Sequence, residues 1–301
     1  MTPATHRHLA FALLFIVPAF WGVNYLVARS AASTVAPHAL ACARWFFAGL
    51  FLATLTWREI AANPAAINRE WKNFLLLGAL GMWICGAFVY LGARTTTATN
   101  IGLFYAISPV LITVFSALVL KERIGPVQVT GTALALAGFM HVLLKGHWLG
   151  LSGLKLVTGD LWVLVSTVSW AAYTILLRAW PSAFRPMARL TLICAGGVVI
   201  LLPFAAIEAA WFMPSHLSWT VAGYVLLVAL FPGFGAYLAY SFMLNELGAA
   251  RVGVVLYLGP IYAAAMAWVG LGEPVLGFHW IGAALILPGI YLATRPSRAP
   301  A

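Results

Sequence analysis

The chain has 301 residues, of which 63% are hydrophobic and only 8% carry a charge. Soluble domains are about a quarter charged, so this composition excludes a water-soluble globular protein and predicts that lipid covers most of the surface. The formal net charge of +10 would indicate a nucleic-acid partner in a soluble protein, but here the Lys and Arg residues lie singly between apolar runs and report membrane orientation instead.

Apolar runs bounded by charged residues, Pro and Gly predict about ten membrane-spanning helices, because each crossing of a core about 30 Å thick takes about 20 residues. The first run follows Arg7 as in a signal peptide, but it continues to Arg29 without a cleavage site, so we expect it to be retained. We place the spans at residues 9–28, 37–57, 73–93, 98–120, 126–144, 158–178, 187–207, 219–244, 250–271 and 278–294. The predicted fold class is an all-α polytopic membrane protein.

The distribution of basic residues predicts the orientation of the chain. If the N-terminus is cytoplasmic, twelve of the 17 Lys and Arg residues fall in cytoplasmic segments, and only Arg29, Arg94, Lys145 and Lys155 fall outside. Arg44 is the one that remains, inside the second span. Cytoplasmic segments carry the excess of positive charge, so we expect both termini in the cytoplasm and the protein in the cytoplasmic (inner) membrane.

The two halves of the sequence resemble each other. An offset of 151 residues aligns ten identities over 98–138, among them Pro109 with Pro260 and Glu122 with Glu273. We therefore divide the chain into a repeat at residues 1–150 and a second at 151–301. Five spans per repeat is an odd number, so the second repeat enters the membrane from the opposite side, and the two form an inverted pair.

Three motifs are similar to those of EamA-type transporters of the drug/metabolite transporter superfamily. They are Phe20-Trp21-Gly22, the segment from Pro109 through Leu120-Lys121-Glu122-Arg123 to Gly131, and the segment from Pro260 through Leu271-Gly272-Glu273-Pro274 to Gly282. The chain most resembles the YddG-type exporters of aromatic and other neutral amino acids. This resemblance implies ten spans in two inverted five-helix repeats and the export of small metabolites.

Candidate gates lie where corresponding spans contain Gly or Pro near the middle of the membrane. Pro109 and Pro260 occupy matching places in the fourth and ninth spans, where we expect both helices to kink. The third and eighth spans carry the other candidate gate or hinge residues, Gly78, Gly81, Gly86, Pro232, Gly233 and Gly235. The alternative is that these residues only permit close helix packing.

Aromatic and amide side chains at mid-depth predict a substrate cavity, because Tyr and Trp offer apolar area, a polar atom and a ring face that attracts cations. Trp83 and Tyr90 are seven apart, and Trp170/Tyr173 and Tyr237/Tyr240 are three apart, so each set shares a helix face. The candidate substrate-binding residues are Trp21, Asn24, Arg44, Trp83, Tyr90, Tyr105, Ser108, Trp170, Tyr173, Tyr237, Tyr240 and Tyr257. Each could instead serve in ordinary packing.

The charged residues limit the mechanism. All seven acidic residues fall at loops or span ends, which argues against proton coupling through a carboxylate and leaves His141 as a candidate proton site or a packing residue. Arg44 either extends to the outer interface or binds a substrate carboxylate. The cysteines, Cys42, Cys85 and Cys194, have no metal-ligand or disulfide spacing, so we expect no metal and no cofactor.

These features predict a transporter of amino acids or similar metabolites that works by alternating access and facilitated flux. Its expected partners are a small-molecule substrate and the lipid bilayer, without nucleic acid; the oligomeric state is left open, and a monomer is a workable unit. The alternatives are a proton-coupled drug or metabolite exporter, a pore, and a membrane-embedded enzyme. We expect no catalytic group, because the sequence has no HExxH, GxSxG or phosphate-loop motif.

Overall fold

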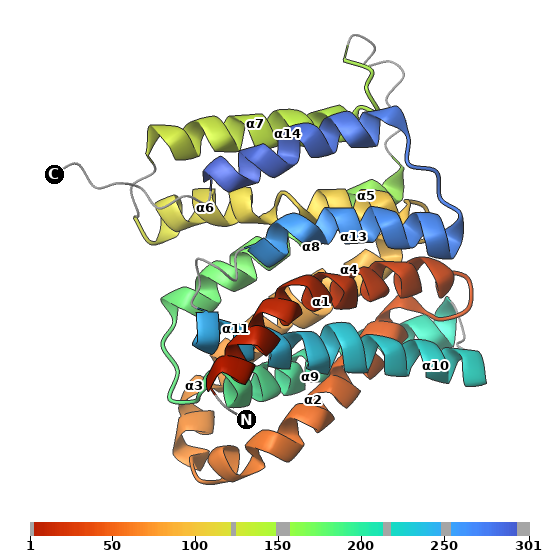
Figure 1. Ribbon diagram of the computed structural model, residues 1–301. Helices are drawn as coiled ribbons and strands as arrows, with labels where there is room; N and C mark the ends of the chain where they lie inside the picture. Colours follow the sequence, from red (N-terminus) through yellow and green to blue (C-terminus); the bar gives the residue numbers. More distant parts are fainter. Residues whose placement is uncertain (1–2, 122–124, 149–156, 213–217, 248–253, 294–301) are drawn as a thin grey trace, which may run out of the picture.

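The computed structural model describes residues 3–121, 125–148, 157–212, 218–247 and 254–293, and every regular element in those segments is a helix. Figure 1 shows the helices packed side by side. Within these described residues, seven segments are long and apolar enough to cross a membrane: His6–Ser30, Pro37–Ala61, Pro64–Gly92, Ala98–Val119, Thr158–Ala179, Pro186–Trp211 and Trp219–Tyr240. The prediction of an all-helical protein with several membrane spans is confirmed, and the total of ten stays a prediction.

The helices are divided at several points by short interruptions within a span. In chain order they are α1 (Pro3–Ser30), α2 (Pro37–Ala61), α3 (Pro64–Gly78), η1 (Ala79–Ile84), α4 (Cys85–Gly92), α5 (Ala98–Tyr105), α6 (Ser108–Val119), α7 (Pro126–Leu143), α8 (Thr158–Ala179), α9 (Pro186–Trp211), α10 (Trp219–Val228), η3 (Ala229–Gly235), α11 (Ala236–Leu247), α13 (Val254–Leu271) and α14 (Gly277–Ala293). Proline lies in the first turn of α2, α3, α6, α7 and α9, where its missing N–H has no helical partner to lose. The third span starts at Pro64, before residue 73, because polar residues ahead of the apolar run continue the helix.

The third and eighth spans each contain a π-helical segment. Their first residues, Ala79 and Ala229, are 150 positions apart (229 − 79 = 150). A π turn interrupts the regular i→i+4 ladder and often marks a functional site. In the eighth span, Pro232 lies inside the segment and lacks the N–H that a regular helix would use.

The two mid-span prolines have different effects. α5 ends at Tyr105 and α6 begins at Ser108, so the fourth span is broken next to Pro109, as expected. At Pro260 the helix is not divided in this way, because α13 continues through that residue, and the expected kink there stays a prediction. One proline removes a single N–H from the ladder, and the packing of neighbouring helices can hold the remaining turns together.

α7 and α14 lie side by side in opposite directions and are held by small residues (Figure 1). A Cβ atom on Gly138 would come within 2.7 Å of Leu285 Cβ and 2.9 Å of the Gly282 carbonyl oxygen. Near the other end of the pair, a Cβ atom on Gly131 would come within 2.7 Å of the Gly289 carbonyl oxygen. Glycine is needed here because only a backbone without a side chain allows this approach of two helices.

α2 and α9 also pack in opposite directions, and each supplies a carboxylate to the start of the other. Glu208, near the end of α9, accepts a hydrogen bond from the His38 N–H at 2.7 Å. Glu59, near the end of α2, accepts one from the Arg185 N–H, also at 2.7 Å. A carboxylate at a helix N-terminus satisfies a free N–H and interacts favourably with the helix dipole.

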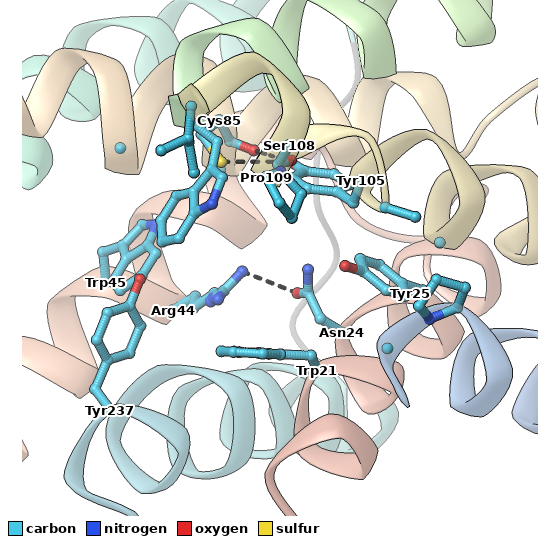
Figure 2. Close-up of a pocket in the computed structure, with 18 residues that line it drawn as sticks. Trp21, Asn24, Tyr25, Arg44, Trp45, Cys85, Tyr105, Ser108, Pro109 and Tyr237 are labelled. Atoms are coloured by element: carbon cyan, nitrogen blue, oxygen red, sulfur yellow. Dashed lines mark hydrogen bonds between the residues drawn. The ribbon is translucent and has the colours of Figure 1, made fainter. Parts of the chain in front are cut away.

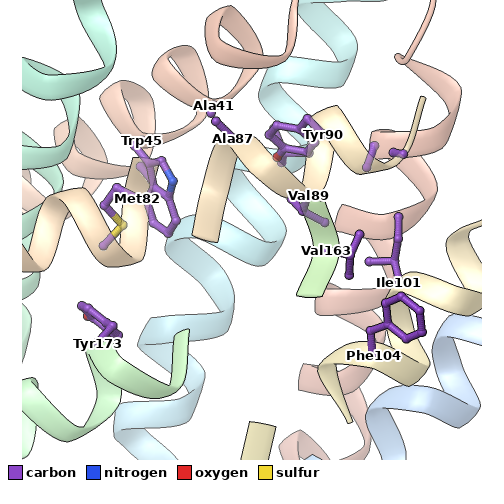
Figure 3. Close-up of a cluster of buried hydrophobic side chains, with 14 of the residues drawn as sticks. Ala41, Trp45, Met82, Ala87, Val89, Tyr90, Ile101, Phe104, Val163 and Tyr173 are labelled. Carbon is purple, nitrogen blue, oxygen red and sulfur yellow. The ribbon is translucent and has the colours of Figure 1, made fainter. Parts of the chain in front are cut away.

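Apolar side chains from these helices form one large buried cluster, part of which Figure 3 shows. Ile101 and Phe104 of α5 meet Val163 of α8 there, and Tyr90 of α4 is buried near Ala41 of α2. Large apolar side chains such as Leu118 and Val269 are more than two-thirds exposed on the outer surface, at 71% and 79%. An outer surface of this kind fits contact with lipid.

Candidate functional site

The interrupted spans surround a cavity of about 900 Å³, counting the space continuous with its mouth, which lies between the two halves of the chain (Figure 2). The lining residues come from α1, α2, η1, α4, α5, α6, α8, α11, α13 and the break in the fourth span. They are Trp21, Asn24, Tyr25, Arg44, Trp45, Gly81, Cys85, Gly86, Gly102, Tyr105, Ala106, Ser108, Pro109, Ile112, Trp170, Tyr237, Gly259 and Pro260.

Arg44 is the one charged side chain among the described residues that line the cavity, and it is 6% exposed. Its Nη1 donates to Asn24 Oδ1 at 2.9 Å and to the Tyr90 hydroxyl at 3.3 Å, and its Nη2 donates to the Pro232 carbonyl at 3.4 Å. The guanidinium also lies 4.4 Å from the centre of the Trp45 ring. Tyr90 in turn donates to Asn24 Oδ1 at 2.8 Å. Arg44 therefore joins α1, α4 and η3, and the interpretation that it extends to the membrane interface is wrong.

Several polar groups in the wall have no hydrogen-bond partner. They are the Nε of Arg44, the Nε1 of Trp45 and the hydroxyl of Ser108, which is 4% exposed. A buried polar group without a partner is costly, so a ligand that satisfies these groups would gain stability from them.

Aromatic rings form much of the remaining wall. Tyr25 and Tyr105 stack with their ring centres 5.8 Å apart, and Trp45 meets Tyr237 edge to face at 6.2 Å. Figure 2 shows Tyr25 and Tyr237 on opposite sides of Arg44 and Trp21 beneath it. Such rings offer a large, rigid apolar surface to a ligand.

Side chains of α8 satisfy the carbonyls in and beside the first π segment. Ser169 donates to the Leu80 carbonyl and Ser166 to the Cys85 carbonyl, at 2.8 and 2.7 Å. The Cys85 carbonyl also accepts a hydrogen bond from Tyr105 at 3.1 Å. An irregular backbone segment at membrane depth needs such partners, because lipid supplies none.

The structure brings eleven of the predicted residues to the cavity: Trp21, Asn24, Arg44, Tyr105, Ser108, Trp170, Tyr237, Gly81, Gly86, Pro109 and Pro260. Other predicted residues lie behind the wall. Tyr90 supports Arg44, and Tyr173 stacks on Trp170 and covers Gly81. Tyr240 contacts Trp21 from outside the lining set.

Trp83 does not line the cavity; its ring stacks on Phe204 of α9 with centres 4.3 Å apart. Gly78 packs against Gly197, and Gly233 against Ala48. Gly235 lies near Phe20, and Pro232 takes part through its carbonyl. The side chain of Tyr257 lies outside the described residues, and so does Glu122.

Sequence reasoning missed seven lining residues: Tyr25, Trp45, Cys85, Gly102, Ala106, Ile112 and Gly259. For Tyr25 a signal was present, because it is four residues after Trp21 and so shares its helix face. Trp45 follows the single arginine within a span. The others are small or apolar residues with no pattern that separates them from packing residues.

The described carboxylates stand away from the cavity and accept hydrogen bonds mainly from groups at the ends of helices and in loops. Glu273 accepts from the N–H groups of Ala98 and Thr99 at the start of α5. Glu70 accepts from the Ser182 hydroxyl and the Ala183 N–H, and Asp160 from the Thr96 hydroxyl. None of the described carboxylates appears among the lining residues.

Two histidines are buried outside the cavity wall. His141 accepts a hydrogen bond from Trp148 Nε1 at 2.8 Å. His279, which the sequence did not single out, contacts Asn100 Oδ1 at 3.2 Å and accepts from the Leu276 N–H. Neither lines the cavity, so neither meets a ligand bound there.

Comparison with known proteins shows that this chain is similar to membrane transporters. Residues 8–144 and 157–295 each match the EamA-like transporter family. An "Uncharacterized transporter" of Archaeoglobus fulgidus is 27% identical over 98% of this chain and 98% of its own length. A protein of Streptantibioticus cattleyicolor named "Probable terminal-alkyne amino-acid exporter" is 26% identical over 82% of this chain and 84% of its own. A solved structure shares the fold with a TM-score of 0.65 at 22% identity, covering 95% of this chain and 96% of that one.

Proposed function

Because the chain belongs to the EamA-like transporter family, we propose that it exports amino acids, aromatic and other neutral ones, and related small metabolites across the cytoplasmic membrane. The observation that carries this proposal is the cavity, in which aromatic rings surround one buried guanidinium. A neutral amino acid has an apolar body for the rings and a carboxylate for the cation. The name of the relative from Streptantibioticus cattleyicolor supports an amino-acid substrate.

The mechanism proposed is alternating access by ten spans in two inverted repeats, at residues 1–150 and 151–301. Three features support it: the family match in both halves, the π segments 150 residues apart, and the reciprocal contacts of Glu59 and Glu208. Inverted repeats can adopt two related conformations, one open to each side of the membrane. The excess of basic residues in alternate segments supports cytoplasmic termini.

We propose that flux is facilitated and follows the gradient of the solute. A proton-coupled carrier normally keeps an acidic or histidine side chain in the pathway, where it can bind and release a proton. Among the described lining residues there is no Asp, Glu or His. These lining residues therefore include no side chain of the kind that would bind and release a proton as the substrate moves.

The test is transport by the purified protein in liposomes. Radiolabelled neutral amino acids, acidic amino acids, sugars and phosphorylated metabolites are each presented, with and without an imposed pH gradient, and protein-free liposomes serve as the control. We expect saturable uptake and counterflow of neutral amino acids that the pH gradient does not change. Flux that does not saturate would indicate a pore. Uptake that is lost when the pH gradient is removed would indicate proton coupling. Either result would overturn the proposal.

A further inference from the structure

We propose that Arg44 recognises the carboxylate of the transported solute and that an α-ammonium group is dispensable, so the cavity also accepts monocarboxylates with an aromatic or aliphatic body. This inference rests on the proposed function, because it concerns the same cavity. It goes beyond that function because it makes the α-ammonium group unnecessary for recognition and so extends the solute class to monocarboxylates.

The first argument is the incomplete pairing of a buried cation. Arg44 is 6% exposed and has no acidic partner among the described residues. Its partners are an amide oxygen, a tyrosine hydroxyl and a main-chain carbonyl, all of them neutral, and its Nε has none. A buried charge of this kind strongly favours an anion, and the guanidinium fork matches the two oxygens of a carboxylate.

The second argument is that the free polar groups of the wall include donors, while strong acceptors are occupied. Arg44 Nε, Trp45 Nε1 and the Ser108 hydroxyl have no partner. Asn24 Oδ1 already accepts from Arg44 and Tyr90, and the Cys85 carbonyl already accepts from Ser166 and Tyr105. A carboxylate is an acceptor only, so it can pair with these donors, which are buried in this conformation, when the wall moves to admit the solute.

The same set of polar groups offers few partners to an ammonium group. It needs acceptors or a negative charge, and the described lining residues supply no carboxylate. The neutral hydroxyl oxygens of Ser108, Tyr25 and Tyr237 and the faces of the aromatic rings remain, and both are weaker partners than an ion pair, especially beside a fixed guanidinium. Removing the amine from the solute therefore removes little binding, whereas neutralising the carboxylate removes the main polar contact.

The experiment compares three ligands of nearly equal shape on the full-length protein in detergent. Phenylalanine has both charged groups, phenylalaninamide lacks the carboxylate, and 3-phenylpropionate lacks the amine. Each competes at equilibrium for bound radiolabelled phenylalanine and, in a parallel set, for bound radiolabelled 3-phenylpropionate. We expect 3-phenylpropionate to bind within about tenfold of phenylalanine, and the amide to bind at least tenfold more weakly.

Variants assign the effect to Arg44. Arg44→Gln should weaken both acids at least tenfold and the amide little, and Arg44→Lys, which keeps the charge without the fork, should be intermediate. Ser108→Ala changes a hydroxyl that has no protein partner, so it tests the donor set even if the arginine variants do not fold. It should weaken the acids more than the amide. Trp83→Phe, outside the wall, is the control.

The outcomes separate the two proposals. If phenylalanine and its amide bind equally, or if 3-phenylpropionate does not bind while phenylalanine does, the inference is overturned and the proposed function stands. If 3-phenylpropionate binds through Arg44 and phenylalanine does not, the inference is supported and the amino-acid function is overturned. Equal weakening of the acids and the amide by Arg44→Gln and by Ser108→Ala would also overturn the inference.

Discussion

The guanidinium of Arg44 donates to the main-chain carbonyl of Pro232, 3.4 Å away and 188 residues further along the chain. This contact ties the cation of the cavity to the π segment η3. Its length is beyond the usual range for an N–H···O bond, so it is a weak partner that a solute carboxylate could replace. Binding of solute would then release η3, which connects recognition at Arg44 to movement of the eighth span.

Replacing Pro232 tests this connection. Pro232→Ala restores an N–H that can join a regular helix, so we expect the π segment to be less easily rearranged. Exchange of labelled amino acid in liposomes should slow by about tenfold, while equilibrium affinity in detergent changes little. Pro203→Ala is the matched control, because Pro203 lies inside α9 with an exposed side chain. Equal exchange rates in the wild-type protein and Pro232→Ala would contradict the role of η3.

The α7–α14 pair predicts a stability difference between two identical substitutions. Gly138→Ala places a Cβ 2.7 Å from Leu285 Cβ, so the helices must separate, at a cost of about 1–3 kcal/mol. Gly223→Ala, in α10, meets nothing within 4 Å and should stabilise its helix by up to about 1 kcal/mol. Thermal unfolding in detergent should therefore shift down for the first variant and stay or rise for the second. A shared direction of change would contradict the packing.

The carboxylates exchanged between α2 and α9 predict that removing Glu208 lowers stability more than removing Glu59. Removing either Glu208 or Glu59 leaves a helix-start N–H without its acceptor, which costs about 0.5–2 kcal/mol. Glu208 is 9% exposed and its carboxylate also lies 3.2 Å from His38 Nδ1, whereas Glu59 is partly exposed to solvent. Glu208→Ala should therefore lower the melting temperature more than Glu59→Ala. The reverse order would show that burial does not govern these contacts.

Trp170, which lines the cavity, and Trp83, which lies outside its wall, predict different effects of substitution on binding and on stability. Trp170 lines the cavity, so Trp170→Ala should weaken binding of a neutral amino acid by about tenfold through lost aromatic contact. Trp83→Ala removes a ring that stacks on Phe204, so it should lower thermal stability and leave affinity nearly unchanged. Binding and unfolding measured on the same preparations check both. Loss of affinity in Trp83→Ala with unchanged stability would contradict the assignment.

Helical class and membrane character follow from the sequence, because long apolar runs with few charges have one stable form in lipid. The local backbone geometry, in particular the position of the π turns, cannot be predicted from the sequence in this way. A π turn changes the angle between residues on either side of it, so the rule that residues seven apart share a face fails across η1. Trp83 lies in η1 and Tyr90 in α4, and they accordingly point to different surroundings: Trp83 to α9 and Tyr90 to Arg44.

The position of Arg44 in the second span is plain from the sequence, but its partners are not. Asn24, Tyr90 and the Pro232 carbonyl reach it from three other helical segments, and which of them does so depends on tertiary packing. Pro109 and Pro260 show the same limit, since equal positions in the two halves give a break in one span and a continuous helix in the other. Pattern identifies candidate residues here, whereas packing decides their roles.

Solute protection of Cys85 is the most direct test that the cavity around Arg44 binds the transported solute. All three cysteines are buried, but Cys85 lines the cavity whereas Cys42 and Cys194 do not, so replacing those two by Ser leaves one thiol that a reagent can approach through the cavity. The rate of its modification by a small methanethiosulfonate reagent is measured in proteoliposomes with and without saturating neutral amino acid. The account predicts that the amino acid slows modification at least about tenfold, as expected for an occupied site. An unchanged rate, under conditions where the same protein transports that amino acid, would contradict it.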